Sequence, residues 1–116
     1  MAIRLKRVYD PPSADDGRRV LVDRVWPRGL SKAEARVDEW LRELGPSTEL
    51  RKWFGHEPSR WDEVRARYQE ELKAPVQRQR LQHVRELASS ETVSILYGAK
   101  DREHNQAVVI AEQLSS

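Results

Sequence analysis

Apolar positions along this chain of 116 residues follow strand-like periods in three places. Alternating apolar residues at 3–9 predict a first strand. Residues 20–22 are consecutive and apolar, which is typical of a strand covered on both faces. Because Pro27 has no amide hydrogen for a sheet ladder, this second strand is expected to end at about Trp26. Residues 92–97 repeat the central apolar run and predict a third strand.

Helical spacing of apolar residues dominates the long stretch between the second and third strands. A first stripe covers residues 37–44, and a second follows the capping residue Ser47 and stops near Gly55. Pro58 opens a longer helix that Pro75 terminates, and a further helix follows it. After the third strand, a last helix carries apolar residues from position 107 to position 114.

The resulting order is strand, strand, several helices, strand and helix. A helical crossover between the second and third strands makes those two parallel. The first two strands are expected to be neighbours across a polar turn at residues 10–17, which is short for a parallel crossover, so the first strand's direction stays open. We therefore predict one α/β domain over residues 1–116. It is a small three-layer-like fold with a short, mostly parallel sheet of about three strands flanked by helices.

Charged residues gather where the second predicted strand ends. Arg24 and Arg28 each carry a planar guanidinium that suits a phosphate or carboxylate. Ser31 and Glu34 form a capping-box pattern, and the start of a helix attracts anions. This region is therefore a candidate site for an anionic ligand.

A second charged loop follows the third strand. Ligands of open parallel sheets bind beyond the carboxyl ends of the strands, so this loop and the one after Val22 are expected to share a rim. We expect Asp23, Arg24, Arg28, Lys100 and Asp101 to meet there across one crevice, with Asp101 also a plausible cap for the last helix. The ligand-binding candidates are Arg24, Trp26, Arg28, Ser31, Lys32, Tyr97 and Lys100, and the candidates for proton transfer are Asp23, Asp101 and His104.

Each candidate also has a structural explanation. The two arginines could pair with nearby acids and lock the loop, and Trp26 could cover the core instead of stacking on a ligand. Asp101 and His104 could merely cap and decorate a helix. His56 and His104 do not follow the spacing of a known zinc site, so no metal or cofactor is predicted.

Composition narrows the classes of function. The absence of cysteine excludes disulfides, thiol catalysis and cysteine-ligated zinc. No apolar run resembles a secretory signal or a membrane span, which predicts a cytoplasmic protein without a membrane partner. The 21 basic and 19 acidic residues leave a net charge of +2, which disfavours nucleic-acid binding. A nucleic-acid or protein interaction module would use the exposed basic residues Arg51, Lys52, Arg78, Arg80 and Arg85.

Several motifs carry a family resemblance. They are Lys-Arg-Val-Tyr at 6–9, Leu-Val-Asp-Arg-Val-Trp-Pro-Arg-Gly at 21–29, Pro-Ser at 46–47, Leu-Arg-Lys-Trp-Phe-Gly-His at 50–56, and Tyr97 with Ala-Lys-Asp at 99–101. With these motifs the chain resembles the YeaO-like bacterial proteins of the domain of unknown function 488 family over nearly its whole length. The resemblance implies a small cytosolic α/β protein and supplies no reaction.

Longer proteins of that group place a helix between the first two strands and typically carry Cys-Ala-Glu and later Cys-His-Arg. Here Tyr97 stands at the first cysteine, and Asn-Gln-Ala occupies positions 105–107. The resemblance therefore brings no thiol or metal chemistry to this chain.

The function predicted from the sequence is binding of a small anionic ligand of the nucleotide or phosphate type at the strand ends. Hydrolysis, group transfer and plain binding stay open, as does the alternative of an interaction module. No phosphate-binding Gly-Lys-Ser loop, dinucleotide fingerprint or serine elbow is present, and neither the substrate nor the oligomeric state follows from the sequence.

Overall fold

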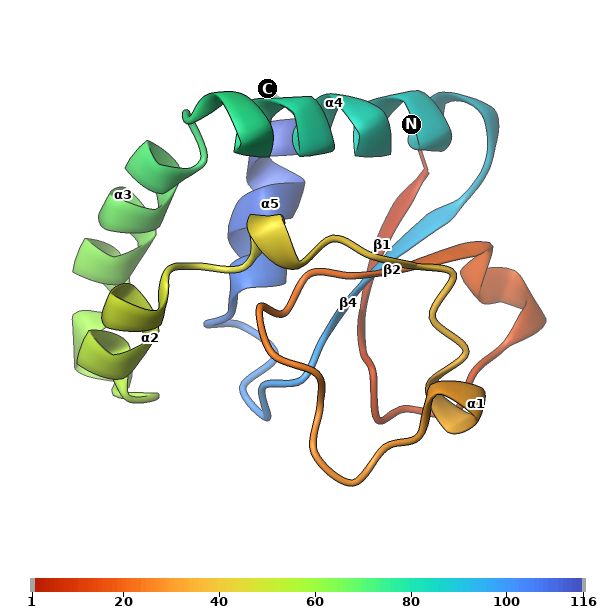
Figure 1. Cartoon of the computed structure of the whole chain (residues 1–116), viewed down its shortest axis with the longest axis horizontal. Coiled ribbons are helices and arrows are strands. Elements are labelled where there is room, and N and C mark those ends of the chain that lie inside the picture. The colour runs from red at the N-terminus through yellow and green to blue at the C-terminus, as the bar shows by residue number, and fades with distance from the viewer. Residues whose placement is uncertain (1, 116) are drawn as a thin grey trace.

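The computed structural model describes residues 2–115 and shows a parallel sheet flanked by helices (Figure 1). The strands are β1 (Ile3–Arg7), β2 (Arg18–Leu21), β3 (Glu39–Trp40) and β4 (Val93–Tyr97). They lie in the order β1-β4-β2-β3, and every pair of neighbours is parallel. The α/β class is confirmed, and the sheet has four strands where the sequence predicted about three.

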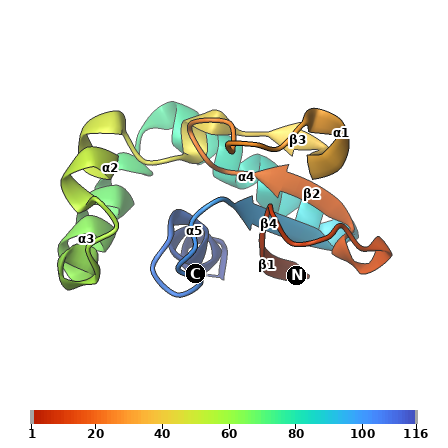
Figure 2. The same cartoon turned by 90° about the horizontal axis from the view of Figure 1, so that it is seen from below.

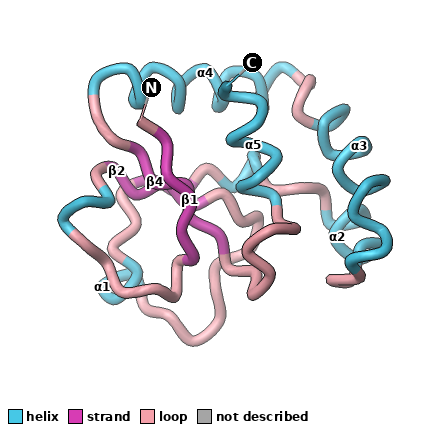
Figure 3. The backbone as a smooth tube through the Cα atoms, turned by 180° about the vertical axis from the view of Figure 1, so that it is seen from behind, coloured by secondary structure: helices cyan, strands magenta, loops and turns pink. Residues whose placement is uncertain are grey.

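The described residues form five α-helices. They are α1 (Lys32–Ala35), α2 (Thr48–Phe54), α3 (Trp61–Glu71), α4 (Pro75–Ser90) and α5 (Gln106–Ser115). Helices α2 and α3 pack side by side away from the sheet, and α5 lies between them and the strands (Figures 1 and 3). The helices predicted after Ser47, Pro58, Pro75 and the third strand are confirmed, and none of the described helices is long and apolar enough to cross a membrane.

Two apolar clusters lie on opposite faces of the sheet. Val20, Val22 and Ile95 belong to the larger cluster, which the helices α2 to α5 complete. Leu21 and Leu96 point to the other face, where α1 and the segment around it cover them (Figure 2). The run at 20–22 is fully buried, so the prediction of a strand covered on both faces is confirmed.

The prediction of a helix over residues 37–44 is wrong. The chain instead adds β3 to the edge of β2, where the Leu41 amide donates to the Leu21 carbonyl at 2.9 Å, and continues into a 3-10 turn at Arg42–Leu44. Trp40 packs on the smaller cluster and Leu41 in the larger one, so the apolar residues serve two faces of the sheet. Their spacing imitates one helical stripe, but pairing with an open strand edge decides the structure.

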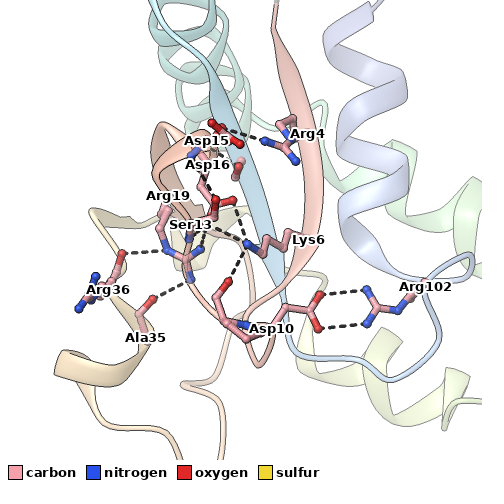
Figure 4. A network of polar contacts seen from close by, with 12 residues as sticks. Arg4, Lys6, Asp10, Ser13, Asp15, Asp16, Arg19, Ala35, Arg36 and Arg102 are labelled. Carbon is pink, nitrogen blue, oxygen red and sulfur yellow. Dashed lines mark hydrogen bonds and ion pairs between the residues drawn. The ribbon is translucent and has the colours of Figure 1, made fainter.

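Strands β1 and β2 are not neighbours, because β4 lies between them. Asp16, in the connection between β1 and β2, is fully buried and links all three strands (Figure 4). Lys6 of β1 and Arg19 of β2 contact its carboxylate at 2.9 and 2.5 Å, and the Ser94 hydroxyl of β4 donates to its carbonyl at 2.7 Å. Burial alone would raise the pKa of Asp16, but the hydrogen bonds from Lys6, Ser13 and Arg19 bring it below its ordinary value. Strands β1 and β2 therefore run parallel on either side of β4, and the connection that contains Asp16 joins them.

Candidate functional site

A cavity of about 410 Å³ opens where β2 and β4 end. Residues 23–28, 98–99 and 104–106 provide one side, and α2 and α3 provide the other. Its volume is within the roughly 300–1,000 Å³ of small-molecule pockets. The structure therefore brings together the two loops that the sequence placed on one rim.

Strand β2 ends at Leu21, earlier than the predicted end near Trp26, and Asp23 turns into the cavity. Its carboxylate accepts the Gly98 amide at 2.9 Å and the side-chain amide of Gln106. A Cβ on Gly98 would lie 2.7 Å from the carboxylate, so this close contact requires glycine. Burial raises the pKa of Asp23 to about 6, against the opposing effects of the Gly98 amide and Arg51. The raised pKa means that Asp23 keeps its proton to a higher pH than an exposed aspartate.

Arg24 holds the segment before α2 in place on the opposite side of the cavity. Its guanidinium donates to the carbonyls of Pro46 and Gly45 at 2.9 and 2.8 Å. A Cβ on Gly45 would lie 2.5 Å from the Arg24 amide nitrogen, so the two segments are in close contact. Arg24 therefore holds the segment that leads into α2, and it does so through carbonyls and not through the acids proposed as its structural partners. Its role as a ligand-binding residue stays a prediction.

Three cations line the cavity with no hydrogen bond or ion pair of their side chains among residues 2–115. They are Arg28 on the loop after β2, and Arg51 and Lys52 on α2. The Tyr9 hydroxyl donates to the Arg28 carbonyl at 2.8 Å and so ties that loop to the end of β1. Asp23 is the one carboxylate in the lining that the structure describes. The cavity consequently has an excess of positive charge.

His104 lines the cavity as well, and Asp101 orients it from behind. The His104 Nδ1 lies 2.8 Å from the Asp101 carboxylate, whose other oxygen accepts the amides of Glu103 and His104. The Glu103 amide and the His104 ring are the main groups that lower the pKa of Asp101. Asp101 was expected to cap α5. Asn105 caps this helix instead, by accepting the Ala107 amide at 2.9 Å.

The remaining candidates lie in different places. Trp26 lines the cavity while its indole donates to the Leu30 carbonyl at 2.7 Å and its ring packs edge-on against Trp40. The capping box of α1 is confirmed, but that helix has only four residues, and the Ser31 hydroxyl oxygen already accepts the Glu34 amide. Candidates outside the cavity lining are Ser31, Lys32, Tyr97, Lys100 and Asp101. Of the five charged residues that were expected to meet in one crevice, Asp23, Arg24 and Arg28 line the cavity. Lys100 and Asp101 do not.

Several cavity residues were not among the predicted site residues. Arg51 and Lys52 were named only for the alternative interaction module, and Phe54 and Trp61 lie on the helices predicted after Ser47 and Pro58. Their spacing on α2 and α3 does reveal a helix with one apolar and one basic face. It does not reveal that the border between those faces meets the ends of the strands, because that depends on how α2 is docked.

The family model and the most similar known proteins indicate the same family for this chain. The model of a family described as "Inactive DUF488-N3 subclade" matches residues 2–116. The uncharacterized protein YeaO of Escherichia coli strain K12 is 42% identical over 116 residues, covering 100% of this chain and 99% of that protein. The uncharacterized protein Rv3073c of Mycobacterium tuberculosis is 40% identical over 113 residues, covering 97% and 93%. No solved structure matches this chain.

Proposed function

The chain belongs to the inactive DUF488-N3 subclade of the DUF488 family, and we propose that it binds a small phosphate-type anion in the cavity at the strand ends. The observation that carries this proposal is a set of three cations around one cavity, Arg28, Arg51 and Lys52, whose side chains have no hydrogen bond or ion pair within the described residues 2–115. Cations left without protein partners in a concave site are available to a ligand's negative charge.

The family description favours binding over catalysis. The subclade is described as inactive, and the resemblance to longer proteins of the group implies that Tyr97 takes the place of their first cysteine. The pair of His104 and Asp101 resembles an oriented base, yet it serves equally well to hold a ligand by a hydrogen bond. We therefore favour ligand binding over a hydrolase or transferase reaction as the role of these residues.

The basic residues proposed for a nucleic-acid or protein interaction module do not form one free surface. Arg80 pairs with Glu43 at 3.3 Å, and Arg85 donates to the Gln113 carbonyl at 2.9 Å. Arg51 and Lys52 line the cavity, away from α4. The charges are thus better placed for a small anion than for a nucleic-acid backbone.

Isothermal titration with inorganic phosphate and pyrophosphate tests the proposal. The double variant Arg51→Gln/Lys52→Gln is expected to bind at least about tenfold more weakly, because hydrogen bonds to charged groups are lost. The matched control is Arg36→Gln/Arg78→Gln, which removes the same charge from two exposed positions outside the cavity. Absence of binding to either anion, or equal affinity in the two double variants, would refute the proposal.

A further inference from the structure

One wall of the cavity consists of four rings. Phe54 and His56 stand at and just beyond the end of α2, Trp61 at the start of α3, and His104 before α5. The ring centroids are 6.3 Å apart for Phe54 and His56, 5.9 Å for Phe54 and Trp61, and 5.4 Å for Trp61 and His104. These are distances at which aromatic rings contact one another. We call these four residues the ring wall.

The local sequence places the ring wall beside the free cations. Arg51 and Phe54 are three residues apart on α2, so they are neighbours on the helix surface. Gly55 and His56 both have positive φ, of 53° and 57°, which ends the helix and turns the chain toward α3. Positive charge and aromatic surface therefore adjoin in one cavity.

Hydrogen-bonding groups lie at the same site. The contact between His104 Nδ1 and Asp101 leaves the His104 Nε2 without a partner among residues 2–115. The side-chain amide of Gln106 donates to Asp23, which leaves its carbonyl oxygen unpaired within the same residues. A ligand with a flat polar ring could pair with both groups, whereas a bare phosphate has no use for the aromatic surface.

We propose that the ligand of this cavity is a nucleoside monophosphate, with its base against the ring wall and its phosphate at Arg28, Arg51 and Lys52. This inference rests on the anion-binding function proposed above and adds the chemical class of the ligand. Every nucleobase has a π-face, and stacking on an aromatic side chain is a recurrent way to bind one. The cavity of about 410 Å³ has the size of a site for one small molecule.

The wild-type protein provides the first test, by titration with adenosine 5′-monophosphate, ribose 5-phosphate and inorganic phosphate. Stacking of the base is expected to make the nucleotide bind about tenfold or more tightly than ribose 5-phosphate. Equal affinity for the three probes would overturn the nucleotide inference and leave the anion-binding function intact. Failure of all three to bind would remove both proposals.

Variants of two tryptophans provide the second test. Trp61→Leu is expected to abolish the preference for the nucleotide over ribose 5-phosphate while affinity for ribose 5-phosphate persists. Trp53→Leu is the matched control, since Trp53 is a half-buried tryptophan of α2 that does not line the cavity. Because Trp61 also packs against the core, Trp61→Phe accompanies it and should retain most of the preference. A preference that survives in Trp61→Leu would overturn the role of the ring wall.

Discussion

The buried carboxyl of Asp23 should make the stability of this protein depend on pH in an unusual direction. Several carboxyls in the described part of the chain, among them Asp10, Asp16 and Asp101, have lowered pKa values, so they add stability at neutral pH that is lost in acid. Asp23 is the opposite case, because burial raises its pKa from 3.8 to about 6. Between these two values the unfolded chain is ionised while the folded protein keeps the proton. Ionisation of Asp23 therefore destabilises the fold as pH rises.

The magnitude follows from the two pKa values. A difference of about two pKa units corresponds to roughly 3 kcal/mol of lost stability once pH exceeds the folded value. Below the unfolded value of 3.8 both states are protonated and the cost disappears. Between about pH 5 and pH 7.5 the cost grows by about 1.4 kcal/mol. Asp23→Asn removes this titration and keeps an oxygen that can accept the Gly98 amide.

Urea denaturation followed by tryptophan fluorescence at these two pH values measures the effect. We expect the stability of Asp23→Asn relative to wild type to rise by about 1.4 kcal/mol from pH 5 to pH 7.5. Asp62→Asn removes a carboxylate from an exposed position on α3 and controls for the loss of one negative charge. A difference between Asp23→Asn and wild type that stays constant with pH, or that falls toward pH 7.5, would refute a raised pKa for Asp23.

The remaining predictions concern the core and the margin of the site. Tyr68→Phe should lower the free energy of unfolding by about 1 kcal/mol, because the buried hydroxyl donates to the Leu44 carbonyl; unchanged stability in thermal denaturation would count against this bond. Asp16→Asn should cost about 3–5 kcal/mol by leaving the buried Arg19 guanidinium without its carboxylate, and a loss under 1 kcal/mol in urea denaturation would contradict that view. Lys100→Gln should leave phosphate affinity unchanged in calorimetry, since Lys100 is exposed and outside the cavity; a clear loss would return it to the site.

Local sequence was sufficient wherever one element carries its own beginning, end and buried face. Ser47 accepts the Leu50 amide and starts α2, and Gly55 ends it in the left-handed region, as their residue types predicted. The apolar residues around Ser94 predicted the strand β4, and all five of its residues are buried. These features depend on neighbours a few residues away, so periodicity and capping chemistry reveal them.

The predictions that were wrong depend on distant pairing. The apolar residues of 37–44 have helical spacing, but Glu39–Trp40 pairs with the open edge of β2 and forms a strand. The first two strands looked like neighbours because they follow each other in sequence, yet β4 enters between them from almost the other end of the chain. No local pattern encodes which strand edge will be occupied.

The candidate site divides in the same way. The sequence by itself determined that charge follows β2 and β4, since Asp23, Arg24 and Arg28 stand directly after a buried strand, and parallel strands end at one edge. Only the tertiary structure decided which charges share the cavity. Docking of α2 through Arg24 brings Arg51 to the strand ends, while the turn before α5 leaves Lys100 in solvent. The physical reason is that residue type fixes what a side chain can bind, whereas long-range packing fixes what it can reach.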